Sequence, residues 1–97
     1  MQAQNRKTLL FREVNDTIDE LLQQFGAEDD ASFFCECPSA ACARRLTLTP
    51  GQYEEIRRRE AFVVAPGCAS GAEIVTEEDA YVVVSSFRFR VRMLAVA

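Results

Sequence analysis

Residues 33–45, FFCECPSAACARR, hold three of the four cysteines in this 97-residue chain. A second short stretch, APGCASG at residues 65–71, holds the fourth. The four cysteines are Cys35, Cys37, Cys42 and Cys68. On an extended backbone, residues two apart project from the same face, so Cys35 and Cys37 can reach one ion while Glu36 points away. The turn after Pro38 brings Cys42 back toward the pair, and Cys68 must fold back to complete the set.

Four thiolates complete the tetrahedral shell of a zinc ion and leave no position open for catalysis. Soft sulfur ligands select zinc or an iron–sulfur cluster over hard cations. The C-x-C-x4-C spacing differs from the usual C-x2-C knuckle, so two alternatives stay open: buried thiols or disulfides, and an iron–sulfur cluster. Where thiols stay reduced, a cysteine cluster indicates metal binding more than a disulfide framework. We therefore expect all four cysteines to bind zinc.

Apolar residues upstream recur at steps of three and four, which is typical of a helix that covers a core. This stripe consists of Phe11, Val14, Ile18, Leu21 and Phe25. It predicts a helix over about residues 7–25 with the stripe turned inward, and Gly26 as its C-terminal stop.

Downstream, TPGQ at residues 49–52 predicts a capped second helix that runs to about residue 60, with Tyr53 and Ile56 inward. Short apolar segments on either side of this helix are typical of strands. The expected strands are 31–37, 43–48, 61–65, 73–76 and 80–84. The sequence therefore predicts one α+β domain over residues 1–97, with two helices packed on a small antiparallel sheet that a four-cysteine metal site staples.

From Ser86 the chain alternates between apolar and basic residues. Arg88, Arg90 and Arg92 share one face of the expected strand, and no acidic residue interrupts the row. We expect this row to bind a partner. The alternative is that the arginines only guard an exposed strand against edge-to-edge aggregation.

Several segments together resemble a family of small, uncharacterised actinobacterial proteins. The segments are FREVND at 11–16, FFCECPSAAC at 33–42, LTLTPGQYEEIRRREAFVVAPGC at 46–68 and YVVV at 81–84. The resemblance covers about residues 10–84 and implies no established activity. The family has a histidine after Pro-Gly where this chain has Cys68. Since histidine and cysteine both ligate zinc, the exchange favours a ligand at this position over a packing residue.

The composition narrows the function. The net charge of −4 argues against non-specific binding to nucleic acid, and the absence of histidine removes the commonest general base. The sequence therefore favours a non-enzymatic, zinc-finger-like interaction or regulatory module over an enzyme. A protein partner is favoured over nucleic acid, and a homodimer stays open because the first stripe is heptad-like.

Two further functions remain as alternatives. One is a thiol or zinc redox sensor, because a C-x-C pair with a nearby third cysteine can release its metal on oxidation. The other is a nucleic-acid- or ribosome-associated accessory protein that binds through the arginine row. The N-terminus shows no secretory signal and no segment has the length of a membrane span, so a cytoplasmic location without membrane contact is expected.

Overall fold

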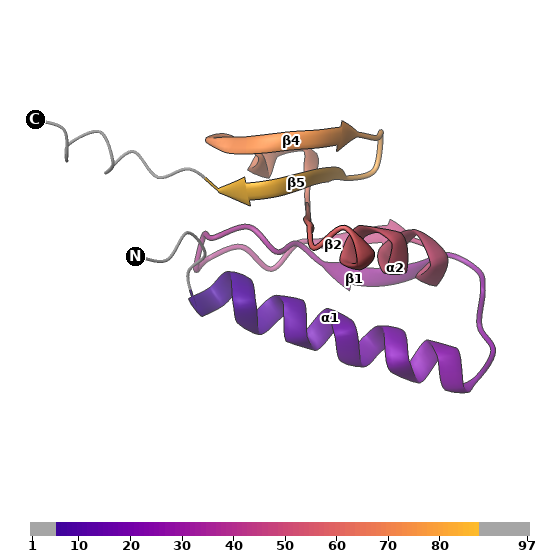
Figure 1. Ribbon diagram of the computed structural model, residues 1–97. Helices are drawn as coiled ribbons and strands as arrows, with labels where there is room; N and C mark the ends of the chain where they lie inside the picture. The colour runs from indigo at the N-terminus through magenta and orange to yellow at the C-terminus, as the bar shows by residue number, and fades with distance from the viewer. Residues whose placement is uncertain (1–5, 88–97) are drawn as a thin grey trace, which may run out of the picture.

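The computed structural model describes residues 6–87, which form three stacked layers (Figure 1). Helix α1 is the lowest layer, strands β1 and β2 lie with helix α2 in the middle, and the β4–β5 hairpin lies above. The elements are α1 (Arg6–Gln24), β1 (Ala31–Phe34), β2 (Arg45–Leu48), α2 (Pro50–Arg58), β3 (Phe62–Val64), the 3-10 turn η1 (Pro66–Cys68), β4 (Ala72–Glu77) and β5 (Val82–Phe87).

The strands form two antiparallel sheets. In the first, β1 pairs with β2, with Ala31 opposite Leu48 and Phe34 opposite Arg45. In the second, β5 lies between β3 and β4. The expected α+β class is confirmed, but two small sheets replace the single one. A backbone hydrogen bond of 2.8 Å from the Glu36 N–H to the Val63 carbonyl links the two sheets.

The strands that flank the cysteine stretch are shorter than expected. β1 ends at Phe34 and β2 begins at Arg45, so the first three cysteines lie in the connection between the strands and not within them. The connection still tightens locally, since the Cys42 N–H bonds the Ser39 carbonyl at 3.1 Å. The pairing of β1 with β2 ends because the Glu36 N–H bonds the Val63 carbonyl of β3 and not β2.

The start of α2 agrees with the sequence. The Thr49 hydroxyl accepts a hydrogen bond from the Gln52 N–H, and the Gln52 side chain accepts one from the Thr49 N–H. This capping box satisfies two helix donors that would otherwise lack partners. The expected inward residues, Tyr53 and Ile56, are buried. The Tyr53 ring stacks on Phe33 of β1 with a centroid separation of 4.7 Å, which anchors α2 on the first sheet.

The orientation of α1 differs from the prediction. The fully buried residues of this helix are Thr8 and Asn15, whereas Val14, Leu21 and Phe25 are 36%, 49% and 81% exposed. Only part of the expected stripe therefore meets the core, where Ile18 packs at its edge. The apolar spacing identified the helix correctly, and Phe11 contacts Phe34 of β1 with a ring separation of 5.6 Å, but Val14, Leu21 and Phe25 do not face the core as predicted.

Polar contacts of α1 explain this rotation. The Asn15 side chain donates to the Phe34 carbonyl at 2.9 Å and accepts from the Phe34 N–H at 2.8 Å, so it pairs with the edge of β1 as a neighbouring strand would. The next residue, Asp16, accepts hydrogen bonds from Tyr53 at 2.6 Å and from Arg57 at 2.8 Å. Burial acts to raise the pKa of Asp16, but these two hydrogen bonds and the charges of Arg57 and Arg12 together outweigh it and lower the pKa.

Asn15→Ala tests the role of this side chain. The change leaves the N–H and carbonyl of Phe34 without their partner at a covered position, so we expect a loss of about 1–3 kcal/mol in the free energy of unfolding. Urea denaturation followed by circular dichroism measures it. The control is Gln23→Ala on the exposed side of α1, which should change stability by less than about 0.5 kcal/mol. Equal effects of the two substitutions would contradict the role given to Asn15.

Candidate metal centre

The structure brings all four cysteines together. Their sulfur atoms all lie within 4.8 Å of one another, and those of Cys42 and Cys68 are 3.9 Å apart. Zinc–sulfur bonds of about 2.3 Å in a tetrahedron place sulfur atoms about 3.8 Å from each other. A small contraction of this cluster would therefore reach the spacing that a bound zinc ion requires.

Two connections supply the ligands. Cys35, Cys37 and Cys42 lie between β1 and β2, near the N-terminal end of α1 (Figure 1), and Cys68 ends η1. The Cys35 N–H bonds the Arg44 carbonyl at 2.9 Å, which holds the two ends of the first connection together. The Cys68 N–H bonds the Ala65 carbonyl at 2.8 Å, which closes the 3-10 turn directly after β3.

The four thiols differ in exposure and acidity. Cys35 and Cys37 are buried, whereas Cys42 and Cys68 are half-buried at the rim. Burial raises the pKa of Cys35 and, less strongly, that of Cys68. Burial also acts to raise the pKa of Cys42, but the Arg44 N–H and the neighbouring thiols stabilise its thiolate and lower the pKa to about 7. The centre therefore has a buried pair and a more accessible rim pair.

Positive and partly positive groups surround the buried pair. The Lys7 ammonium donates to the carbonyls of Cys35 and Cys37 at 3.1 and 2.8 Å, and it lies 3.7 Å from the Cys37 sulfur. The Ala65 N–H donates to the Cys35 sulfur at 3.1 Å. Four thiolates around a divalent ion carry a net charge of −2, so such donors suit a metal-bound state.

Glu36 points away from the sulfurs, as expected, but its carboxylate is fully buried. It accepts hydrogen bonds from the Asn15 side chain at 2.8 Å and from the Val63 N–H at 3.0 Å. Burial raises the pKa of Glu36 to about 7, although these donors and the more distant Arg57 and Arg12 oppose the shift. Glu36 thus anchors the segment from Cys35 to Cys37 on the face opposite the sulfur atoms.

Sequence reasoning did not identify Lys7, Asn15 or Glu36 as parts of this centre. The alternation within Cys-Glu-Cys does place Glu36 on the face opposite the sulfurs. That alternation gave no sign that the opposite face would be covered by α1. Lys7 and Asn15 lie far from the cysteines in sequence, and only the packing of α1 brings them near.

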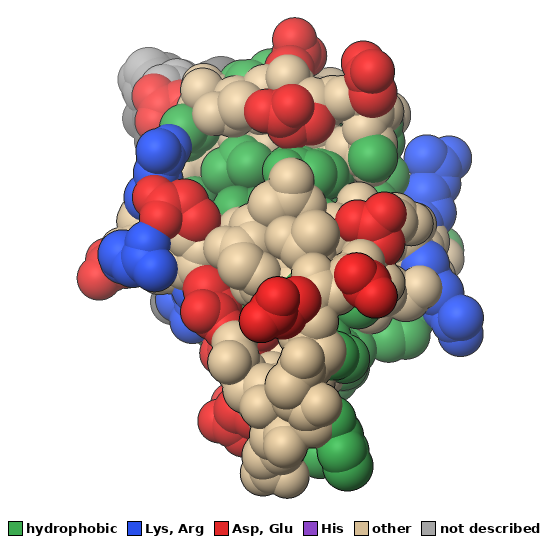
Figure 2. Space-filling model, turned by 90° about the vertical axis from the view of Figure 1, so that its right-hand side faces the viewer, with side chains coloured by type: hydrophobic (Ala, Val, Ile, Leu, Met, Phe, Trp, Pro, Cys, Tyr) green, Lys and Arg blue, Asp and Glu red, His purple; other side chains and the backbone are tan. Residues whose placement is uncertain are grey.

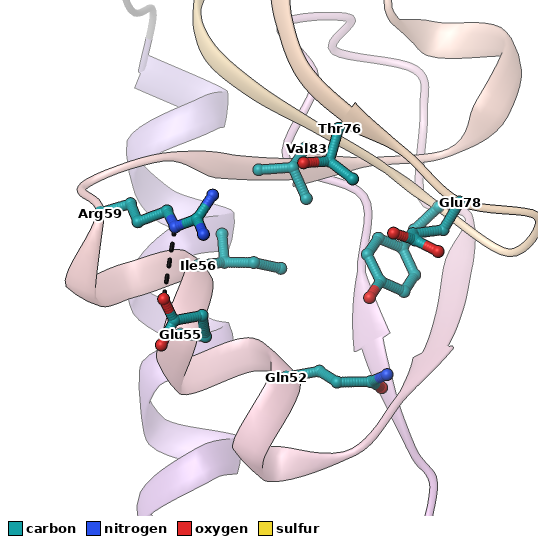
Figure 3. A pocket seen from close by; sticks show the side chains of 8 residues that line it. Gln52, Glu55, Ile56, Arg59, Thr76, Glu78 and Val83 are labelled. Carbon is teal, nitrogen blue, oxygen red and sulfur yellow. Dashed lines mark hydrogen bonds and ion pairs between the residues drawn. The ribbon is translucent and has the colours of Figure 1, made fainter.

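An open cleft of about 240 Å³ lies between α2 and the second sheet (Figure 3). The apolar side chains of Ile56 and Val83 point into it, and Arg59 forms an ion pair with Glu55 at 3.3 Å on one side. Its remaining lining residues are Gln52, Thr76, Glu78 and Tyr81. This cleft contains none of the cysteines, so it is separate from the metal centre.

The remaining expected site, the row Arg88, Arg90 and Arg92, lies outside the described residues, so it stays a prediction.

Comparisons with protein-family models, with curated proteins and with solved structures find no match. The resemblance to the actinobacterial family therefore also stays a prediction. Among the helices of residues 6–87, none is long and apolar enough to cross a membrane.

The lowered pKa of Cys42 predicts an order of reactivity in metal-free protein. The thiolate is the nucleophile, and about half of the Cys42 side chains should be thiolate near pH 7. The alkylation rate of Cys42 should therefore fall as the pH drops below that value. Iodoacetamide labelling at several pH values, followed by peptide mass spectrometry, measures the order. Cys42 should react first and buried Cys35 last. Faster labelling of Cys35 than of Cys42 would contradict the described environment.

Proposed function

We propose that this protein is a non-enzymatic zinc-binding module, in which one zinc ion on Cys35, Cys37, Cys42 and Cys68 holds the fold that a protein partner recognises. The observation that carries the proposal is the convergence of all four sulfur atoms within 4.8 Å of one another. The proposed role is that of an accessory or regulatory protein in the cytoplasm.

The donor set supports zinc over other cations. Four thiolates with no oxygen or nitrogen ligand suit zinc or iron–sulfur chemistry, and magnesium and calcium prefer oxygen. A cluster of this size suits a single ion. Lys7 and the Ala65 N–H supply the outer contacts that thiolate-bound zinc requires.

The same donor set supports a structural role. Catalytic zinc sites keep a position open for water or substrate, and four cysteine ligands would fill every position. The chain also has no histidine to act as a general base beside such an ion. The metal would then join the β1–β2 connection to η1, so that metal binding and folding energy are coupled.

One observation favours a second candidate function, a redox sensor. Cys42 and Cys68 are the more exposed pair, and their sulfurs are 3.9 Å apart. A peroxide would oxidise the Cys42 thiolate to a sulfenic acid and release hydroxide or alkoxide. The Cys68 thiol would attack that sulfur, forming the disulfide and releasing water. The metal would lose two of its four ligands and dissociate.

Ligand substitution tests the structural zinc site. Elemental analysis of protein purified without chelator should find about one zinc per chain. Cys42→Ser and Cys68→Ser should each lower the melting temperature by roughly 10 °C or more, because each removes one of four ligands. Cys68→His should retain zinc best, since imidazole also ligates zinc. Folded wild-type protein without zinc or iron would overturn the site, whether or not the serine variants fold.

Mild peroxide treatment separates the two candidate functions. A purely structural site should keep its zinc and its thiols under conditions that oxidise a known sensor protein. A sensor should release zinc, which a chromogenic chelator detects, and peptide mapping should locate a Cys42–Cys68 disulfide. Zinc release accompanied by a Cys35–Cys37 disulfide would contradict the assignment to the rim pair.

A further inference from the structure

One exposed flank of α1 carries large apolar side chains that no described element covers. Figure 1 shows β1, β2 and α2 on one side of α1 only. Leu10, Val14, Leu21 and Phe25 are 54%, 36%, 49% and 81% exposed. At 100° per residue these four side chains lie within one narrow sector of the helix and its C-terminal end, and we call them the α1 strip. Contiguous exposed apolar patches of this kind mark interaction sites.

The spacing of the α1 strip is the same in both directions along the helix. The steps between successive members are four, seven and four residues. A second helix laid antiparallel, with a two-fold axis near Thr17 and Ile18, would place Leu10 against the partner's Phe25 and Val14 against the partner's Leu21. Two-fold interfaces require a surface that complements itself in this way. The strip meets that requirement over the length of α1, which at 19 residues is about 28 Å.

Charges at the two ends of α1 favour the same arrangement. The exposed Arg6 begins the helix, and the exposed run Glu28-Asp29-Asp30 follows its end. Figure 2, which views the end of the molecule where α1 finishes, shows acidic side chains gathered on that face. An antiparallel pair brings the cationic start of each helix to the acidic end of the other. It also places the helix dipoles in opposite directions.

From these observations we propose that the protein forms a two-fold homodimer through the α1 strip, with the two α1 helices antiparallel. The partner that covers the strip is a second copy of this chain. The proposed dimer contacts involve none of the cysteines, so the dimer can form whether or not the cysteines bind zinc. Because one helix face is a small interface, the dimer depends on protein concentration.

The first test measures oligomeric state by sedimentation equilibrium over a wide concentration range, using the full chain with its natural metal content. Leu21→Glu should raise the dimer dissociation constant about tenfold or more, because each substitution occurs twice across the two-fold axis. The matched control is Ile74→Glu on β4, since Ile74 is also 49% exposed. Circular dichroism checks that both variants fold.

Single cysteines added to α1 test the direction of pairing. In the antiparallel arrangement, the two copies of Thr17 lie beside the axis, whereas the two copies of Gln24 lie about 20 Å apart along it. Thr17→Cys should therefore form an intermolecular disulfide under mild oxidation, and Gln24→Cys should not. Crosslinking of both variants would indicate parallel helices and overturn the arrangement.

Two further results would overturn the proposal. A wild-type protein that stays monomeric at every concentration would assign the α1 strip to another occupant, either residues 88–97 of the same chain or a different protein. A dimer that Ile74→Glu dissociates and Leu21→Glu does not would move the interface to β4.

Discussion

The buried carboxylate of Glu36 accepts hydrogen bonds from Asn15 of α1 and from the backbone of Val63 in β3, and it lies between two of the four cysteines. Burying a carboxylate costs free energy unless hydrogen-bond donors satisfy it. The Glu36 carboxylate therefore holds its two donors in place, and the donors hold the carboxylate. The segment from Cys35 to Cys37 is thereby held from behind, while its sulfurs face Cys42 and Cys68. The geometry of the metal centre thus depends on a polar contact on the opposite face of the same segment.

The rotation of α1 follows from the same contacts. Asn15 bonds the edge of β1 and Glu36, and Asp16 binds Tyr53 and Arg57, so one polar side of the helix is turned inward. Hydrogen bonds are directional, whereas apolar burial is not. The helix therefore docks where its donors and acceptors find partners, and part of its apolar surface is left outside. That exposed surface is the face through which we propose that the protein dimerises.

The metal centre has a protected side and an accessible side. Cys35 and Cys37 are buried beneath Lys7 and the start of α1, and the backbone of Ala65 binds one of their sulfurs. Cys42 and Cys68 lie at the rim, where their connections reach solvent. A structural site and a redox-sensitive site use the same four ligands. The two proposed functions would differ in how readily the rim pair leaves a bound ion.

The four cysteines as one set, the two helices, the capping box at Thr49 and the α+β class could all be predicted from the sequence. The helices and the cap depend on local signals, such as apolar periodicity and capping residues, which act within one or two turns of chain. The cysteines form one set because four thiolates complete a single zinc shell. The sequence did not determine the division into two sheets, the rotation of α1, or the parts that Lys7, Asn15 and Glu36 play around the sulfurs. Those features depend on pairings such as Asn15 with Phe34 and Glu36 with Val63. Such hydrogen bonds join residues 19 and 27 positions apart, so which buried polar groups meet depends on how the whole chain folds.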